Sequence, residues 1–341
     1  MKSRIIRVLV VDDSPMFRQL IVRGLSTDPN IEVIATACDA YDASEKIVEF
    51  DPDVVTCDVE MPKMNGIEFV KRLMPQYPVP VITVSSLTDK VFDAIQAGAV
   101  DFVGKPNLQS KFDIERFILE LIDKVKAAAN SKVFSGYSTS EKSNDDSKTI
   151  KNFKKILVIG ASTGGTQALS QFLSNMPKDI PGMVIVQHIP PKFSKMFADR
   201  LNSSLPFEVK EAETGDLIER GRVLIAPGDK HMRVVKFGMK YKVECFEGDK
   251  VSGHCPSVDV LFDSAAKNIG KDAVGIILTG MGYDGAKGML AMKRKGAHTI
   301  GQDEKSSVVY GMPRAAYDMG AVDKQVSLEA LPEYLISYLK D

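Results

Sequence analysis

Ser162, His188 and Asp284 are residue types that together could perform nucleophilic catalysis, and each follows an apolar run typical of a buried parallel strand. The three runs are 156–160, 183–187 and 274–279. In an open α/β sheet, residues just beyond the carboxyl ends of the strands share one crevice. A serine, a histidine and an aspartate that meet there predict a hydrolase.

Three carboxylates form a second candidate site early in the chain. Asp12 and Asp13 end the apolar run 8–11, and Asp58 ends the apolar run 53–57. By the same geometry of parallel strands, the three side chains converge at one edge of a sheet. Such a cluster suits a hard divalent cation.

The elements that must position these residues indicate an α/β protein of two domains. From residue 5 to about 126, apolar runs alternate with amphipathic helical patterns, which predicts a doubly wound, five-stranded parallel sheet. The predicted strands are 6–11, 31–36, 53–57, 80–84 and 100–103, followed by a closing helix near 111–128.

Residues 127–152 are rich in Ser, Asn and charged side chains, which is typical of a flexible linker. The predicted first domain is therefore 1–126, and the predicted second domain is 153–341. A linker of this composition should let the two domains move relative to one another.

The second domain also alternates, so a doubly wound, mostly parallel sheet is predicted for it. Between about 205 and 250 the pattern changes to short apolar runs separated by turn sequences, which predicts an antiparallel excursion with a hairpin. The runs are 222–226, 232–235 and 241–245.

The composition excludes several classes of protein. A net charge of −1 gives no electrostatic case for binding nucleic acid or a membrane surface. No unbroken apolar stretch approaches the roughly 20 residues of a spanning helix.

The first residues run into a strand that ends in two aspartates, which does not fit a secretory leader, so a cytoplasmic protein is expected. The four cysteines are scattered without a C-x-x-C pair, and we expect them to be reduced.

The first domain resembles a response-regulator receiver. Asp12 and Asp13 end the first predicted strand, Asp58 ends the third, Ser85 follows the fourth, and Lys105 precedes a proline after the fifth. The resemblance implies that Asp58 accepts a phosphoryl group while Asp12, Asp13 and Asp58 hold Mg²⁺. It also implies that Ser85 and Lys105 bind the phosphoryl oxygens, and it places Phe102 where receivers carry a switching aromatic residue.

Each of these residues also has a plain structural interpretation. Asp12 and Asp13 could cap the helix that begins at Ser14 and Pro15. Ser85 could be an ordinary polar strand end, and Lys105 could belong to a turn. Their joint occurrence at matching strand ends favours the receiver.

The serine lies in a sharp turn between a strand and a helix, Gly-Ala-Ser-Thr-Gly-Gly at 160–165, which satisfies the Gly-x-Ser-x-Gly nucleophile elbow. A dinucleotide-binding loop has a similar pattern. That alternative requires an acid at the end of the next strand, where this chain has Gln187 and His188. The elbow is therefore the better interpretation.

The other two triad candidates also have structural alternatives. His188 could be a loop residue before a Pro-Pro pair, and Asp284 could be the N-cap of the next helix. The order Ser, His, Asp along the chain differs from the order Ser, Asp, His of α/β-hydrolases, so the triad is predicted on a different scaffold.

Residues 153–341 resemble the catalytic domain of the chemotaxis protein-glutamate methylesterases. Long motifs carry the resemblance: besides the elbow, they are Gln-His-Ile-Pro at 187–190, Ala-Pro-Gly-Asp-Lys-His-Met at 226–232, Pro-Ser-Val-Asp-Val-Leu-Phe at 256–262, Gly-Met-Gly-Tyr-Asp-Gly-Ala at 280–286 and Gly-Met-Pro at 311–313. The order of receiver, linker and esterase matches that family over the whole chain.

The resemblance implies a reaction and its partners. Ser162 attacks the methyl ester of a glutamate on a chemoreceptor, His188 transfers protons, Asp284 orients the imidazole, and glutamines are deamidated by the same chemistry. The backbone N–H groups around Met281 or Thr163 are candidate oxyanion donors. A chemotaxis histidine kinase is the implied phosphodonor, and the esterase reaction itself needs no cofactor.

Domain order together with the resemblance predicts that the unphosphorylated receiver inhibits the esterase. The alternative is a phosphorylation-gated adaptor that binds receptors or kinase without catalysis. A monomer is the simplest expectation for the assembly. His231 follows a Pro-Gly-Asp turn, where a role in the hairpin loop is favoured over a place in the substrate groove, and no function is predicted for His254 or His298.

Overall fold

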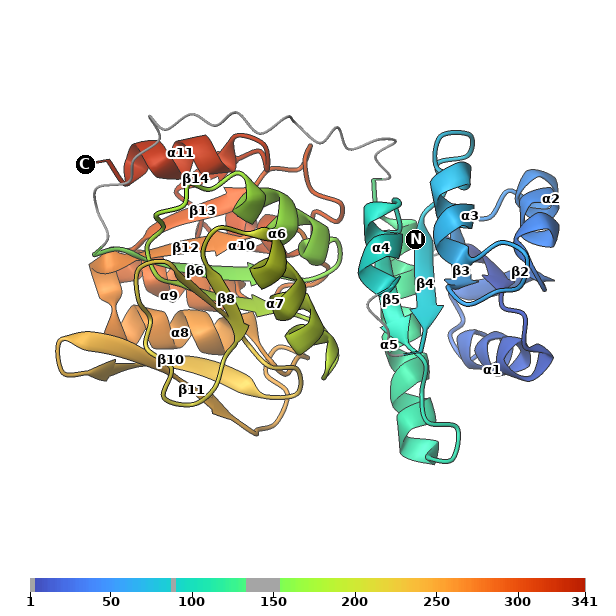
Figure 1. Ribbon diagram of the computed structural model, residues 1–341, viewed down its shortest axis with the longest axis horizontal. Helices are drawn as coiled ribbons and strands as arrows, with labels where there is room; N and C mark the ends of the chain where they lie inside the picture. Colours follow the sequence, from blue (N-terminus) through green and yellow to red (C-terminus); the bar gives the residue numbers. More distant parts are fainter. Residues whose placement is uncertain (1–3, 87–89, 133–153, 341) are drawn as a thin grey trace. The chain divides into compact units, whose positions relative to one another are not determined.

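The computed structural model describes residues 4–86, 90–132 and 154–340. The chain divides into two compact units, Met1–Thr139 and Ser140–Asp341 (Figure 1). The first residues of the predicted linker at 127–152 instead complete α5 (Lys111–Ala129), in which Ala127 and Ala128 are buried. Linker residues 133–152 lie outside the described residues.

The first unit contains the predicted five-stranded parallel sheet, with strand order β2-β1-β3-β4-β5. Its strands are β1 (Ile6–Val11), β2 (Ile31–Ala37), β3 (Val54–Asp58), β4 (Val81–Ser85) and β5 (Asp101–Gly104). Strand β1 lies between β2 and β3, so the winding direction reverses there. The carboxyl ends of β1 and β3 are therefore neighbours at the switch point of the sheet.

Four of the helices in the first unit begin at a residue whose side chain accepts a hydrogen bond from the first turn, which supplies one of the missing partners of a helix start. These caps are Ser14, Asp39, Asn65 and Ser110. The helices of this unit are α1 (Pro15–Leu25), α2 (Ala40–Phe50), α3 (Gly66–Leu73), α4 (Lys90–Gln96) and α5. The described part of this unit thus has the five strands and five helices that the sequence predicts.

The second unit is built on a seven-stranded sheet with strand order β14-β13-β12-β6-β7-β9-β8, in which every pair of neighbours is parallel. The strands are β6 (Ile156–Ala161), β7 (Met183–Gln187), β8 (Glu208–Glu211), β9 (Arg222–Ile225), β12 (Ala273–Ile277), β13 (His298–Gln302) and β14 (Lys324–Val326). The winding direction reverses between β6 and β12, which is the switch point of this sheet.

The predicted hairpin is present, but its extent differs from the prediction. Strands β10 (His231–Phe237) and β11 (Lys240–Phe246) form an antiparallel, two-stranded sheet of their own. The prediction that 222–226 belongs to the same antiparallel excursion is wrong, because β9 pairs in parallel with β7 and β8. Val223, Leu224 and Ile225 are fully buried, as expected for a strand covered on both faces of a parallel sheet.

Helices cover both faces of the larger sheet (Figure 1). Helices α8 and α9 pack together on one side, and α11 packs near α6. The helices are α6 (Gly165–Ser174), α7 (Phe193–Ser204), α8 (Val258–Asn268), α9 (Ala286–Arg294), α10 (Met312–Asp318) and α11 (Leu331–Tyr338), with a short 3₁₀ turn at Gly270–Asp272. The hairpin is held against α8, since Val234 N–H donates to Ser264 Oγ and the Asn268 amide donates to the Val234 carbonyl.

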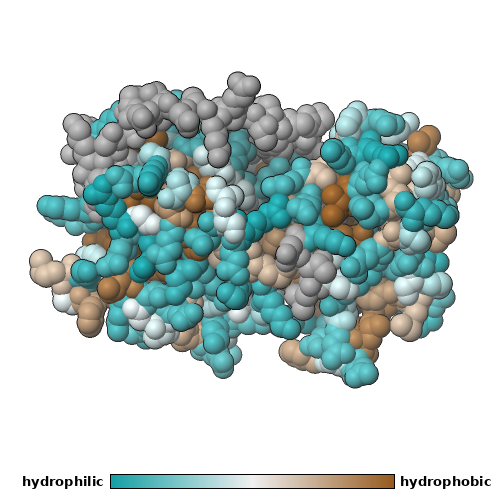
Figure 2. Space-filling view, viewed as in Figure 1, coloured by the Kyte–Doolittle hydropathy of each residue, from teal (hydrophilic) through white to brown (hydrophobic). Residues whose placement is uncertain are grey.

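The surface that Figure 2 shows is mostly hydrophilic, with hydrophobic residues in small separate areas. None of the described helices is both long and apolar enough to cross a membrane.

Because each unit has its own core, we predict that core mutations act on one unit at a time. Phe172 of α6 is fully buried in the second unit, and Phe69 of α3 is 2% exposed in the first. Substituting either by Ala should destabilise its unit by about 3–5 kcal/mol, since the truncation leaves a cavity. Differential scanning calorimetry of the full chain should show a lowered transition for the altered unit only. A single transition that moves equally in both variants would contradict this prediction.

Candidate active site

The three triad candidates come from three adjacent strands of the second unit. Ser162 follows β6, His188 follows β7, and Asp284 lies in the loop between β12 and α9. Strand β6 lies between β7 and β12, so the serine is central and its two partners come from either side. The candidates therefore meet at the carboxyl edge and at the switch point of the sheet.

The turn that carries Ser162 is braced from several directions. The Ser162 carbonyl accepts hydrogen bonds from Gly165 N–H at 2.7 Å and from Gln187 Nε2 at 2.9 Å. Gly164 has a φ of +76°, and a Cβ there would lie 2.7 Å from the Val308 side chain. Glycine is thus required by both conformation and space, and the elbow is held tightly beneath the serine.

The side chains form a continuous hydrogen-bonded triad. His188 Nδ1 lies 3.1 Å from Ser162 Oγ, and His188 Nε2 lies 2.9 Å from Asp284 Oδ2. An ionised carboxylate only accepts hydrogen bonds, so Nε2 carries the proton and Nδ1 has the free lone pair. In this arrangement Nδ1 is the atom that can take the serine proton.

Asp284 is not the N-cap of the helix that follows it, since Gly285 occupies that position in α9. Its carboxylate instead lies at the N-terminus of α8. It accepts hydrogen bonds from Ser257 Oγ at 2.8 Å, from Val258 N–H at 2.8 Å and from Asp259 N–H at 2.9 Å. The partial positive charge at a helix start favours an anion there.

These contacts determine the protonation of Asp284. Burial alone raises the pKa of this carboxyl, but the hydrogen bond and charge of His188 and the backbone donors of Asp259 and Val258 outweigh burial and hold the pKa below its ordinary value. Asp284 is therefore ionised at neutral pH and keeps the imidazole in one orientation.

His254 is a further residue of the site, for which the sequence predicts no function. Its ring stacks on that of His188, with centroids 3.8 Å apart and an angle of 13° between the planes. Burial, followed by the neighbouring His188, lowers the pKa of His254 to about 3. His254 is thus a neutral, flat surface against one face of the His188 imidazole. A histidine in a turn next to a cysteine carries no sequence signal for this contact.

The two candidate oxyanion donors lie beside the serine. Thr163 directly follows Ser162 in the chain. Met281 directly follows Gly280, which packs so closely on the serine that a Cβ on Gly280 would lie 2.7 Å from Ser162 Cβ. Within the described residues, neither the Thr163 nor the Met281 backbone N–H donates to a protein acceptor. Both N–H groups are therefore available to an oxygen that develops negative charge next to Ser162.

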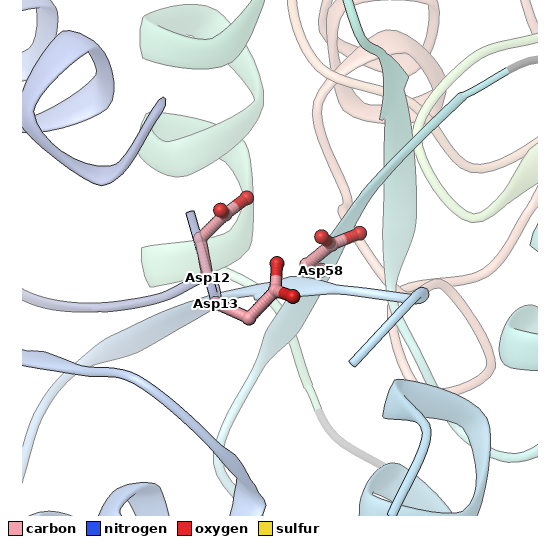
Figure 3. Close-up of side chains that lie close together, drawn as sticks. All are labelled: Asp12, Asp13 and Asp58. Atoms are coloured by element: carbon pink, nitrogen blue, oxygen red, sulfur yellow. The ribbon is translucent and has the colours of Figure 1, made fainter. Parts of the chain in front are cut away.

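The three N-terminal acids also converge, as the sequence predicts (Figure 3). One carboxylate oxygen from each of Asp12, Asp13 and Asp58 lies within 4.8 Å of the others. Asp12 Oδ1 accepts from Ser14 N–H at 2.9 Å, while Ser14, and not an aspartate, caps α1. The capping alternative for these aspartates is therefore wrong.

Burial shapes the charge of this cluster. It raises the pKa of Asp12 and of Asp58, and the hydrogen bond and charge of Lys105 oppose that shift only in part. Lys105 Nζ donates to Asp58 Oδ2 at 2.6 Å and forms an ion pair with Asp12 Oδ2 at 3.2 Å, and this Asp12 oxygen is buried with no other donor among the described residues. Three close carboxylates opposed by a single lysine fit a divalent cation.

Ser85 and Phe102 are the remaining residues that the receiver resemblance singles out. Ser85 ends β4 and its hydroxyl donates to the Ser86 carbonyl at 2.9 Å. Phe102 in β5 is buried, with its ring edge-on to Phe92 at 5.7 Å. Their proposed roles in phosphoryl binding and switching depend on a phosphorylated state.

Comparison with known proteins gives the family. Residues 157–335 match the CheB methylesterase family model, and residues 8–114 match the response regulator receiver domain model. The chain is 52% identical to a protein-glutamate methylesterase/protein-glutamine glutaminase of Syntrophomonas wolfei, over 98% of both chains. It is 44% identical to the protein of that name from Salmonella typhi, over 97% of this chain and 96% of the relative.

A solved structure supports the same assignment. The crystal structure of the CheB methylesterase catalytic domain of Thermotoga maritima is 39% identical with a TM-score of 0.53, and it covers 54% of this chain and 98% of that one. With a family model that spans more than half of its residues and full-length relatives at this identity, the chain belongs to the CheB methylesterase family.

Proposed function

We propose that this chain hydrolyses glutamate methyl esters on chemoreceptors and deamidates receptor glutamines, under the control of phosphorylation. The observation that carries the proposal is the continuous chain of hydrogen bonds from Ser162 through His188 to Asp284 at the switch point of the sheet. The names of the full-length relatives supply the substrate class, which is an ester or amide of a protein glutamate side chain.

Each proton in the proposed reaction has an atom to receive it. Ser162 Oγ attacks the side-chain carbonyl carbon while its proton passes to His188 Nδ1. The imidazolium returns that proton to the leaving methoxide, so methanol departs and an acyl-serine remains. Water, deprotonated by the same nitrogen, then releases glutamate and restores Ser162. With a glutamine substrate the leaving group is ammonia.

The surrounding groups stabilise the charged intermediates of this reaction. Asp284 is ionised and fixed, so it favours the imidazolium that forms at His188. The N–H groups of Thr163 and Met281, which have no acceptor in the described part of the chain, would donate to the oxyanion. The neutral His254 stacked on the imidazole adds no repelling charge of its own.

In the first unit, Asp58 would accept a phosphoryl group from a chemotaxis histidine kinase. Asp12, Asp13 and Asp58 would hold Mg²⁺, which neutralises charge on the transferring oxygens when it is bound. Lys105, already 2.6 Å from Asp58, would contact a phosphoryl oxygen, and Ser85 at the end of β4 would donate to another. The side chain of Phe102 would switch position when Asp58 is phosphorylated.

We further propose that the unphosphorylated first unit inhibits the second, and that the protein is a cytoplasmic monomer. An adaptor that binds receptors or kinase without catalysis is the alternative. A hydrogen-bonded triad, next to two N–H groups that have no acceptor among the described residues, favours the enzyme, because an adaptor has no need of them.

We predict that methanol release from methylated receptor membranes depends on the triad. Ser162→Ala should lower the rate at least about a thousandfold, because it removes the attacking oxygen. Ser170→Ala, which removes a helix hydroxyl bonded to the Thr166 carbonyl, is a matched control that should keep the wild-type rate. Equal release by wild type and Ser162→Ala would support the adaptor instead.

We predict that a small-molecule phosphodonor raises methanol release only when both Asp58 and a divalent cation are present. Asp58→Asn removes the phosphoryl acceptor, and a chelator of divalent cations removes the ion that the three carboxylates would hold. Basal release should persist in both cases, because the triad uses no metal. Stimulation that survives the chelator would contradict the assigned Mg²⁺ site.

We predict that deletion of residues 1–150 raises the basal rate of methanol release to the phosphorylated level or above it. The physical reason is removal of an inhibitory domain while the triad and its sheet remain complete. Circular dichroism of the truncated protein should confirm that the second unit is folded. A rate at or below that of the unphosphorylated full-length protein would exclude autoinhibition.

A further inference from the structure

A second line of hydrogen bonds continues from Asp284 away from the catalytic serine. Ser257 Oγ donates to Asp284 Oδ1 at 2.8 Å, and the backbone N–H of Ser257 donates to His231 Nδ1 at 3.2 Å. His231 Nε2 in turn lies 2.9 Å from the carbonyl oxygen of Asp249. The catalytic carboxylate is thus connected to a histidine at the start of β10.

These contacts fix a single form of the His231 side chain. A carbonyl oxygen only accepts, so Nε2 carries the proton, and Nδ1 must then accept from the Ser257 N–H. His231 is 2% exposed, and a Cβ on Gly248 would lie 3.2 Å from the ring. The ring is enclosed and both of its nitrogens are in use, so it does not line a substrate groove.

The two partners of His231 are the two ends of one loop, 249–257. This loop carries His254, whose ring stacks on His188. It is closed internally by paired backbone hydrogen bonds between Val251 and His254, and Ser252 Oγ donates to Asp259 Oδ2 at 2.7 Å. One imidazole therefore joins the ends of the segment that supplies both the stacking ring and the Ser257 hydroxyl.

We propose that His231 is a positioning residue for the triad. By joining the ends of the loop 249–257, it places Ser257 Oγ on Asp284 and His254 on His188. The proposed positioning role follows from these contacts. It rests on the proposed function only in that the triad is taken to hydrolyse glutamate methyl esters. It replaces the role in the hairpin loop that the sequence favours, because the His231 nitrogens bond the loop 249–257 and not the turn of the hairpin.

The proposal predicts a specific kinetic change. His231 does not touch the substrate, so its loss should leave KM unchanged and lower kcat through misplaced Asp284 and His188. A displacement of about 1 Å in a catalytic group can cost roughly a hundredfold in rate. A residue that only supports the fold would instead lower the amount of folded protein without changing kcat per folded molecule.

Two substitutions separate the nitrogens. His231→Asn puts an amide oxygen near the place of Nδ1 and can still accept from Ser257 N–H, whereas His231→Gln puts its amide near the place of Nε2 and can still donate to the Asp249 carbonyl. We expect kcat for methanol release to fall about tenfold or more in His231→Gln and clearly less in His231→Asn, with KM unchanged. The matched pair His298→Asn and His298→Gln, at a half-buried histidine on β13, should leave kcat at the wild-type value.

A second readout is independent of the physiological substrate. The rate at which a fluorophosphonate probe labels Ser162 reports how well His188 and Asp284 activate the serine. Labelling should slow in His231→Gln and not in the His298 variants. Slowed labelling with no methanol release from wild type would support the positioning role and overturn the proposed substrate. Equal labelling of wild type, His231→Asn and His231→Gln would overturn the positioning role.

If the His231 variants fail to fold, variants of Ser257 test the same proposal, because Ser257 links His231 to Asp284. Ser257→Ala removes the hydroxyl that donates to Asp284, and Ser257→Thr keeps a hydroxyl. The control Ser327→Ala removes a hydroxyl that accepts from Ala330 N–H before α11. Labelling slowed in Ser257→Ala and restored in Ser257→Thr supports the proposal, and labelling unchanged in Ser257→Ala contradicts it.

Discussion

The geometry of the second unit depends on satisfying one buried carboxylate. Asp284 is 1% exposed, and an ion so far from water is stable only when donors surround it. Its donors are His188 Nε2, Ser257 Oγ and the backbone N–H groups of Val258 and Asp259. The same bonds that stabilise the charge therefore join the loop after β12 to the start of α8 and to the imidazole. Removing any one of them leaves the charge less well paired and the imidazole less well oriented.

In the first unit, the pKa values of the buried carboxylates shift in the direction opposite to that of Asp284. Asp12 and Asp58 are also almost fully buried, but burial raises the pKa of both, and Lys105 compensates only in part. Protein donors saturate Asp284, whereas Asp12 and Asp58 are left with a mutual repulsion that a bound divalent cation would reduce. This contrast fits the proposal that the triad acts through protein groups and that the N-terminal acids bind a divalent cation.

Sequence patterns could predict where several strands end. They could not predict how every strand pairs or which residues contact each other across distant segments. Apolar runs located the strands before Ser162, His188 and Asp58 because parallel strands are continuously apolar. They could not separate β9 from the hairpin, since short apolar runs between turns look alike in both. His254 and His231 were beyond prediction because their contacts join segments that only the packing of α8 and the loop 249–257 brings together.

The strand order also explains why Ser, His and Asp follow this sequence along the chain. Strand β6 comes first in the chain and lies at the centre of the sheet. Strand β7 follows and lies on one side of β6, and β12 comes after the hairpin and α8 and lies on the other side. His188, which follows β7, contacts both partners across the end of β6, with Nδ1 toward Ser162 and Nε2 toward Asp284. Chain order thus follows from topology, while the chemistry requires only that one imidazole contacts both partners.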